Sequence, residues 1–310
     1  MNFYVYAPSY NPNSGGCIAL HKLVHIINSE TEYKAYLVPR VVEKYRLEGM
    51  RDYFRVVRNK IKLYRKRTQY KTNPAFNTPV VRKLSDIDTN TGVCVYPEIT
   101  FGNPLKAKKV VRWFLHQPGH FTKEICYGTG ELYFKFNSAI KDFQLYNSKL
   151  SPKELKVIHY PLEIYNKNTV DEKRAGICYM VRKGKHKAFI HPDDALCLDG
   201  CSHEEIAQAF KTHERFISYD DYTAYSLFSV LCGCKSIVVP DELISIDEWY
   251  PNVKDRYGIA YGVSEEQLSW ASETSDKVLE LIKEEHNRSV KCVLDFINEC
   301  DSYFSSHNDC

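Results

Sequence analysis

Short apolar runs alternate with polar segments rich in Gly, Pro and Asn along the first half of the chain. Residues 2–7 predict a buried strand, residues 8–16 a loop, and residues 17–27 a helix with one apolar face. A strand, a glycine-containing loop and a helix in this order are typical of the start of a nucleotide-binding α/β domain. Further strands are predicted at residues 35–38, 92–96, 110–115, 143–147 and 157–160.

A second series of elements follows a polar stretch at residues 161–171, which has the composition of a linker. We therefore expect an α/β protein with two Rossmann-like domains, residues 1–163 and 164–285, that face each other across a cleft in the manner of the GT-B fold. Residues 286–310 are expected to form a C-terminal helix that packs back on the first domain. The second series comprises predicted strands at residues 175–181, 216–218 and 236–239 and predicted helices at residues 204–210, 223–232 and 265–304.

Composition agrees with this organisation and narrows the chemistry. The length of 310 residues suits two domains of about 150 residues each. The eleven cysteines are scattered and form no paired CxxC motifs with matching histidines, so we expect reduced cysteines and no metal site. The chain does not begin with a basic and then apolar leader, and no apolar run approaches about 18 residues. A cytoplasmic protein is therefore expected.

Positive charge is concentrated in residues 40–71, where twelve Lys or Arg face three acidic residues in a chain whose net charge is +3. Apolar residues recur there at helical spacing, which predicts a basic amphipathic helix. Such a helix is either a solvated surface or a peripheral contact to anionic lipid headgroups at the inner membrane face. The sequence pI of about 8.2 is lower than that of a typical nucleic-acid-binding protein, so no nucleic acid partner is expected.

Gly15 and Gly16 open the first predicted helix after a strand. Residues without a side chain let the backbone approach a ligand closely, and a helix N-terminus favours negative charge. These two glycines are therefore candidates for binding a phosphate-bearing ligand.

A second candidate segment follows the predicted strand at residues 216–218. Asp220 or Asp221 is placed to cap the next helix, and Thr223 and Ser226 fall in its first turns. Free backbone N–H groups and hydroxyls at this point either cradle the phosphate or ribose of a nucleotide, or only cap a structural helix.

Residues 218–240, SYDDYTAYSLFSVLCGCKSIVVP, resemble the donor-binding helix of GT-B glycosyltransferases, in which an acidic residue precedes a helix that ends in a small-Gly-small turn and a buried strand. In the large retaining family two acidic residues lie eight positions apart ahead of that glycine, here Gly233. Asp220 matches the first position, whereas Phe228 occupies the second. The resemblance implies a nucleotide-sugar donor, and Phe228 leaves open whether the anomeric configuration is inverted or retained.

Other segments fit the same resemblance. Arg182 and Lys185 match the basic loop that neutralises the donor diphosphate, and Gly15 and Gly16 match the glycine turn that faces the sugar. Residues 96–105 and 110–119 look like the N-terminal half of bacterial surface-polysaccharide glycosyltransferases. Within them, Glu98 is a candidate catalytic base or a loop and acceptor contact. His116 is a candidate donor-sugar contact or a structural histidine.

The resemblance implies transfer of a sugar from a nucleotide-sugar to a glycan or lipid-linked glycan acceptor in surface polysaccharide synthesis. Cations and a helix N-terminus would stabilise the leaving group without a metal or other cofactor. The pairs Asp193-Asp194 and Asp220-Asp221 lack the spacing of a metal-binding DxD motif, and the absence of GxGxxG and GxxxxGK[ST] motifs argues against dinucleotide oxidoreductases and P-loop enzymes.

Two alternative functions stay open. His191-Pro192 is similar to the HP motif of CMP-sugar transferases of the Kdo and sialyl type. A non-catalytic nucleotide-sugar-binding protein is the other alternative, because the second acidic position of the retaining family is lost.

Overall fold

The computed structural model describes residues 1–40, 69–168, 173–242 and 244–306. The chain divides into two compact units, one formed by Met1–His159 with His286–Cys310 and the other by Tyr160–Glu285. Each unit is built on its own parallel sheet, so the prediction of two Rossmann-like α/β domains is confirmed. The expected basic helix at residues 40–71 falls almost entirely on residues 41–68, which lie outside the described residues.

The first unit contains a six-stranded sheet in which every strand pair is parallel, with the order β2-β1-β3-β4-β5-β6. Helix α1, Gly15–Glu30, joins β1 to β2. A short 3-10 turn, η1, lies at Leu84–Asp86. The strands are β1 Asn2–Ala7, β2 Lys34–Pro39, β3 Val93–Pro97, β4 Lys109–Phe114, β5 Leu132–Lys135 and β6 Lys149–Glu154.

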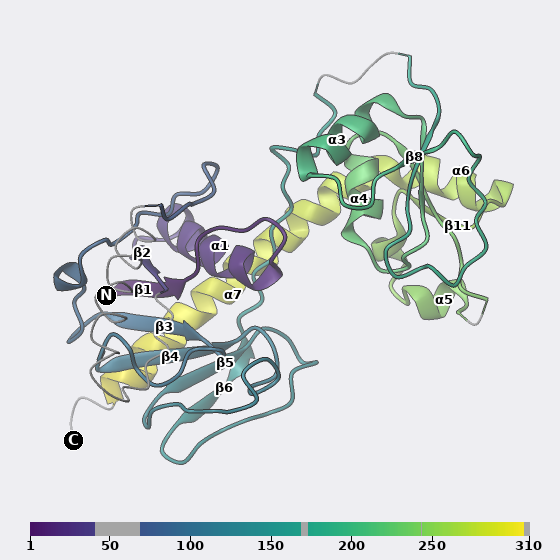
Figure 1. Ribbon diagram of the computed structural model, residues 1–310. Helices are drawn as coiled ribbons and strands as arrows, with labels where there is room; N and C mark the ends of the chain where they lie inside the picture. Colours follow the sequence, from purple (N-terminus) through teal and green to yellow (C-terminus); the bar gives the residue numbers. More distant parts are fainter. Residues whose placement is uncertain (41–68, 169–172, 243, 307–310) are drawn as a thin grey trace, which may run out of the picture. The chain divides into compact units, whose positions relative to one another are not determined.

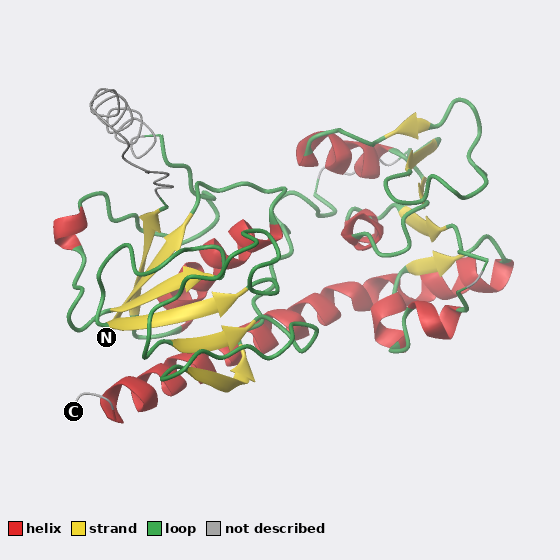
Figure 2. Ribbon diagram, turned by 60° about the horizontal axis from the view of Figure 1, so that its bottom comes forward, coloured by secondary structure: helices red, strands yellow, loops and turns green. Residues whose placement is uncertain are grey.

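One face of this sheet is covered by two helices. Alternate strand residues such as Phe3 and Trp113 share one core with α1 and with the C-terminal part of helix α7, Val278–Ser306. Phe296 of α7 packs against the Phe3 ring with 5.4 Å between ring centroids. Figures 1 and 2 show α7 running alongside these strands. The C-terminal helix therefore contributes to the core of the first unit.

The second unit contains a five-stranded parallel sheet with the order β11-β10-β9-β7-β8. Its core includes Cys178 and Met180 of β7, apolar residues of the helices around the sheet, and Val278 and Ile282 from the start of α7. The strands are β7 Ile177–Met180, β8 Leu196–Cys197, β9 Arg215–Ser218, β10 Lys235–Val238 and β11 Ile259–Tyr261. The remaining elements are α3 His203–Thr212, α4 Ala224–Leu231, α5 Ile246–Trp249, η2 Val253–Arg256, α6 Glu265–Thr274 and η3 Ser275–Lys277.

Two predicted strands of the first unit are wrong. Residues 143–147 and 157–160 are loops, and the strands of this region are β5 and β6. The apolar pattern failed there because β6, KLSPKE, is a polar strand at the sheet edge. Pro152 in this strand has no N–H to donate. An edge strand has no neighbour on its outer side that would need that donor, so the hydrogen-bond ladder tolerates the proline.

Gly184, in the loop after β7, is required by a close approach of two loops. A Cβ at this position would overlap the carbonyl oxygen and Cβ of Tyr219 in the loop after β9. At Gly15, by contrast, a Cβ would meet no atom within 4 Å. The loops after β7 and β9 can therefore lie against each other only because residue 184 has no side chain.

Gly184→Ala should destabilise the fold by about 1–3 kcal/mol, because the added methyl forces the two loops apart. Gly15→Ala is the matched control and should be neutral or slightly stabilising, since alanine favours the helix. Urea unfolding of both variants measures the difference. Equal stability of Gly184→Ala and the native chain would contradict the close approach.

Candidate functional site

The carboxyl ends of the parallel strands carry the candidate residues in both units. Parallel strands end at one edge of a sheet, and ligands bind α/β sheets at that edge. In the first unit Glu98 follows β3 and His116 follows β4. The N–H of Leu115 donates to Oε2 of Glu98 at 3.1 Å, so the two neighbouring strand ends are joined directly at the candidate base.

Glu98 is buried, and burial raises the pKa of its carboxyl group. Hydrogen bonds from its own N–H and from Leu115, together with the charges of His116 and Arg40, act in the opposite direction. Arg40 is held beside this edge by its N–H, which donates to the Ala7 carbonyl at 2.8 Å. Burial and these neighbours therefore shift the pKa of Glu98 in opposite directions, and burial has the larger effect.

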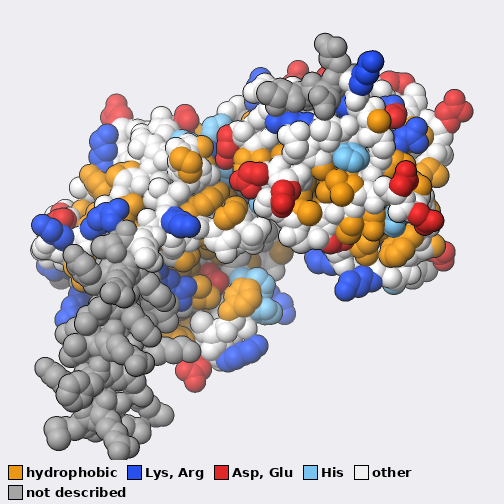
Figure 3. All heavy atoms as spheres, turned by 45° about the horizontal axis from the view of Figure 1, so that its top comes forward, with side chains coloured by type: hydrophobic (Ala, Val, Ile, Leu, Met, Phe, Trp, Pro, Cys, Tyr) orange, Lys and Arg blue, Asp and Glu red, His pale blue; other side chains and the backbone are white. Residues whose placement is uncertain are grey.

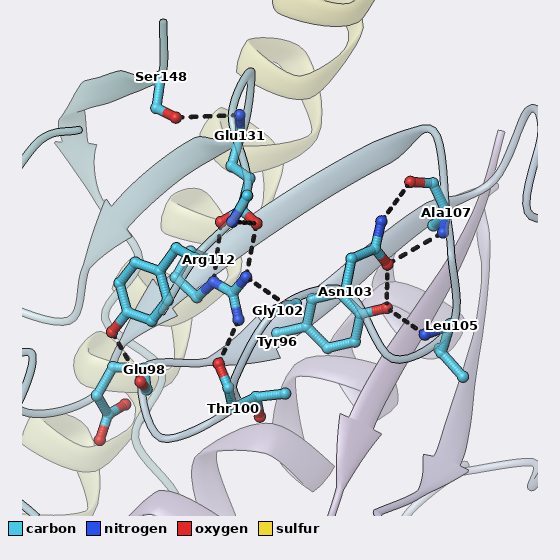
Figure 4. A network of polar contacts seen from close by, with 12 residues as sticks. Tyr96, Glu98, Thr100, Gly102, Asn103, Leu105, Ala107, Arg112, Glu131 and Ser148 are labelled. Carbon is cyan, nitrogen blue, oxygen red and sulfur yellow. Dashed lines mark hydrogen bonds and ion pairs between the residues drawn. The ribbon is translucent and has the colours of Figure 1, made fainter. Parts of the chain in front are cut away.

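A buried ion pair fixes the loop that begins at Glu98 (Figure 4). Arg112 of β4 donates through Nε and Nη2 to the two carboxylate oxygens of Glu131 at 2.9 and 2.6 Å. Its remaining donors bind the carbonyls of Thr100 at 2.8 Å and Gly102 at 2.9 Å. The Tyr127 hydroxyl donates to the Glu98 carbonyl at 2.7 Å, under the guanidinium that lies 4.4 Å above its ring.

His116 is exposed, and its Nδ1 accepts a hydrogen bond from the Gln117 N–H at 2.8 Å. A neutral ring that accepts at Nδ1 carries its proton on Nε2. The ring therefore offers a donor to the surroundings. Its centroid lies 4.1 Å from that of His120.

Gly15 and Gly16 form the first turn of α1, after the N-cap residue Ser14, whose hydroxyl accepts from the Cys17 N–H at 3.4 Å. Both glycines line a hollow of about 340 Å³ together with Leu115 and His159. Leu115 directly precedes His116. The glycines and the end of β4 thus line one recess of the first unit.

In the second unit the loops after β7 and β9 meet at Arg182. Its Nε lies 3.4 Å from Oδ2 of Asp220, and its guanidinium lies 5.4 Å above the Tyr225 ring of α4. The side chain of Arg182 is 44% exposed, so it stays accessible to a ligand. Of the sequence-predicted donor residues, the structure brings Arg182 and Asp220 into direct contact.

Arg182 has a left-handed backbone, with φ of 45°, and Asp199 after β8 holds it. The carboxylate of Asp199 accepts from the N–H of Val181 at 2.7 Å and from the N–H of Arg182 at 3.1 Å. Asp199 was not predicted as a site residue. Nothing in the sequence around it indicates that it binds a loop 17 residues earlier in the chain.

The lysines of the same loop behave differently from one another. Lys185 is exposed, and no described residue forms a hydrogen bond with its side chain. Lys187, by contrast, is buried and donates to both carboxylate oxygens of Asp221 and to the Val239 carbonyl, each at 2.7 Å. Lys187 and Asp221 join the loops after β7, β9 and β10, and this pairing was not predicted from the sequence.

The expected N-cap of α4 is corrected by the structure. Thr223 is the N-cap, and its hydroxyl accepts from the Tyr225 N–H at 3.4 Å. Asp220 instead accepts from the Tyr222 N–H, and Asp221 is engaged by Lys187. Ser226 is buried in α4, and within the described part of the chain its hydroxyl has no hydrogen-bond partner.

A further hollow of about 550 Å³ lies at the opposite edge of the second sheet, where β9 and β10 begin. Arg215, Lys235 and Gly233 are among its lining residues, and none of the sequence-predicted donor residues is. This hollow is an alternative location for a ligand that the experiments below must separate from Arg182.

The described residues include no helix long and apolar enough to cross a membrane. They also contain no group of three or more His, Cys, Asp or Glu arranged to hold a metal ion.

No family model matches the chain, and no curated protein matches its sequence. Among solved structures, the chain is similar to sucrose-phosphate synthase from Thermosynechococcus elongatus, with 8% identity and a TM-score of 0.38 over 99% of this chain and 100% of that one. A similarity of this degree identifies neither the family nor the activity of the chain.

Glu98→Gln should change how stability depends on pH. Because the raised pKa means that the fold holds the proton of Glu98 more tightly than the unfolded chain does, this group stabilises the fold below its ordinary value of 4.5. That contribution is lost as pH rises through the raised pKa. The stability of Glu98→Gln relative to the native chain should therefore increase from acid to neutral pH in urea unfolding. Glu124→Gln, which removes an exposed carboxylate of the same unit, is the control, and the same trend in both variants would contradict the assignment.

Proposed function

We propose that this chain is a glycosyltransferase that moves a sugar from a nucleotide-sugar donor to a glycan or lipid-linked glycan acceptor, as in surface polysaccharide synthesis. The observation that carries the proposal is the meeting of Arg182, Asp220 and the N-terminus of α4 at the carboxyl edge of the second sheet. A half-exposed guanidinium beside a helix N-terminus is suited to bind the phosphates of a nucleotide.

The ion pair between Arg182 and Asp220 fits this role. At 3.4 Å it is longer than a strong charge-assisted hydrogen bond, and Arg182 is partly in solvent. A diphosphate, with its larger charge, would compete successfully for the guanidinium. Lys185 lies three residues later and is exposed, so its side chain would be able to reach the same phosphates.

The first unit would supply the proton acceptor. As the anomeric C–O bond breaks and the nucleoside phosphate leaves with its electron pair, the acceptor hydroxyl attacks and loses its proton. Glu98 would take that proton, because a raised pKa makes its carboxylate a stronger base than an ordinary glutamate. His116 would donate a hydrogen bond from Nε2 to the acceptor.

The CMP-sugar alternative receives no support from His191. Its Nδ1 lies 2.7 Å from the Tyr219 hydroxyl, and its ring stacks on Tyr179 with 3.6 Å between centroids. The Nδ1 atom and the ring of this histidine are thus engaged within the second unit. Hydrolysis of a panel of UDP-, GDP-, dTDP- and CMP-sugars without acceptor decides among the donors. Binding of a nucleotide-sugar without any turnover would instead indicate a non-catalytic protein.

Arg182→Ala should weaken donor binding by about tenfold to a hundredfold, since a charge-assisted contact to phosphate contributes about 1.5–3 kcal/mol. Arg215→Ala is the matched control, because Arg215 is 49% exposed, close to the 44% of Arg182, and lies at the opposite edge of the same sheet. Calorimetric titration with the nucleotide-sugars of the panel measures the affinities, and a thermal melt confirms folding. A loss in Arg215→Ala alone would move the donor to the hollow at the other edge.

Transfer or donor hydrolysis should persist in EDTA, because the proposed leaving-group stabilisation relies on Arg182, Lys185 and the α4 N-terminus. Initial rates before and after chelation measure this. Complete loss, restored by Mn²⁺ or Mg²⁺, would show that a metal ion performs this role.

A further inference from the structure

Three rings gather on the surface beside the end of β4. The His116 centroid lies 4.1 Å from that of His120 and 4.9 Å from that of Phe121, and His120 and Phe121 are 4.8 Å apart. All three side chains are exposed, and Phe121 is 64% exposed. Ring clusters usually form where rings are buried in a core. Burial within this unit therefore does not account for this cluster, which we call the ring platform.

The loop that bears the ring platform is fixed by its own backbone. The N–H of His120 donates to the Gln117 carbonyl at 3.1 Å, and the N–H of Lys123 donates to the Gly119 carbonyl at 2.8 Å. Gly119 supplies the left-handed turn, with φ of 80°. The Gln117 side chain accepts from the Lys141 N–H at 2.9 Å and anchors the loop to the next one. The rings are therefore presented without the entropy cost of ordering a free loop.

The histidines of the ring platform bring hydrogen-bonding groups next to Phe121. His116 holds its Nδ1 against the Gln117 N–H, which leaves Nε2 as an outward donor. Leu115, one residue before, binds the carboxylate of Glu98. An apolar face with polar groups at its rim matches a pyranose ring, which has an apolar C–H face and a rim of hydroxyls. Figure 3 shows that histidine and hydrophobic side chains lie next to each other on the molecular surface.

We propose that a saccharide ring of the acceptor stacks on Phe121, with His116 and His120, whose ring planes are tilted by 58° and 88° to that of Phe121, at its edge. The identification of the saccharide as the acceptor rests on the proposed function, whereas saccharide binding itself does not. The proposal excludes a purely lipid acceptor at this position, because an acyl chain gains nothing from the polar rim.

Phe121→Ala is the decisive variant, and its folding is secured by the exposure of the ring. Phe121→Tyr keeps the ring face, and Tyr146→Ala removes another exposed aromatic side chain of the same unit, 86% exposed, outside the platform. Saturation-transfer NMR with maltotriose, cellotriose, chitotriose and mannotriose measures direct binding. Phe121→Ala should weaken the best of these ligands roughly twofold to tenfold, while Phe121→Tyr and Tyr146→Ala should match the native chain.

Three outcomes would overturn the proposal. They are equal saccharide affinity of Phe121→Ala and the native chain, no saccharide binding by the native chain, and a Phe121-dependent association with phosphatidylcholine–phosphatidylglycerol vesicles in place of saccharide. Hydrolysis of the nucleotide-sugar panel by the native chain tests the transferase separately. If the native chain hydrolyses a nucleotide-sugar and saccharide binding is the same in Phe121→Ala, the saccharide site at Phe121 is wrong and the proposed transferase activity is retained. If saccharide binding needs Phe121 while no nucleotide-sugar is hydrolysed or bound, the platform stands and the transferase is wrong.

Discussion

Arg112 lies wholly buried in the middle of a parallel sheet, and the geometry of the first unit depends on how its charge is neutralised. Glu131 provides the opposite charge, and the carbonyls of Thr100 and Gly102 take the remaining donors. Removing one partner of a buried pair leaves an uncompensated charge, which costs about 3–5 kcal/mol. The loop after β3 must therefore curl around the guanidinium. This holds Glu98, at the start of the loop after β3, in a fixed position.

The second unit solves the same problem with a different pair. Lys187 is buried against Asp221 and the Val239 carbonyl and so ties together three strand ends. Both units thus use a buried cation with several hydrogen bonds to hold polar loops at the carboxyl edge of a sheet. Loops at this edge must also leave groups accessible to a ligand. A buried charge with directional donors supplies rigidity that an apolar core would supply elsewhere.

The sequence predicts well those features that depend on local pattern. Strands such as β1 and β3 are nearly continuous apolar runs, as expected for a parallel sheet covered on both faces, and they were predicted. The edge strand β6 was not, since an exposed polar strand has no pattern of its own. The arrangement of both strand series into two parallel sheets followed from the order of the elements alone.

Partner choice among polar residues was beyond the sequence. Lys183, Lys185 and Lys187 share one short loop, and only the approach of the loop after β9 buries the last of them. Likewise, Asp220, Asp221 and Thr223 are all good N-caps by residue type. Asp221 is taken by Lys187, which leaves Thr223 to cap α4. Such choices are made by tertiary contacts between loops that are distant in sequence, and a local rule cannot decide them.

Arg182 shows what these constraints achieve. A non-glycine residue in a left-handed conformation costs of order 1–3 kcal/mol, and glycine would adopt it freely. The two hydrogen bonds from the backbone to Asp199 offset that cost, and they turn the side chain toward Asp220 and Tyr225. Glycine would avoid this strain but has no guanidinium. The strained arginine therefore places a cation at this strand end. In the proposed function the donor phosphate would replace the Asp220 carboxylate beside a guanidinium whose backbone is already fixed, and a cation positioned in advance is the condition under which electrostatic stabilisation of a leaving group is most effective.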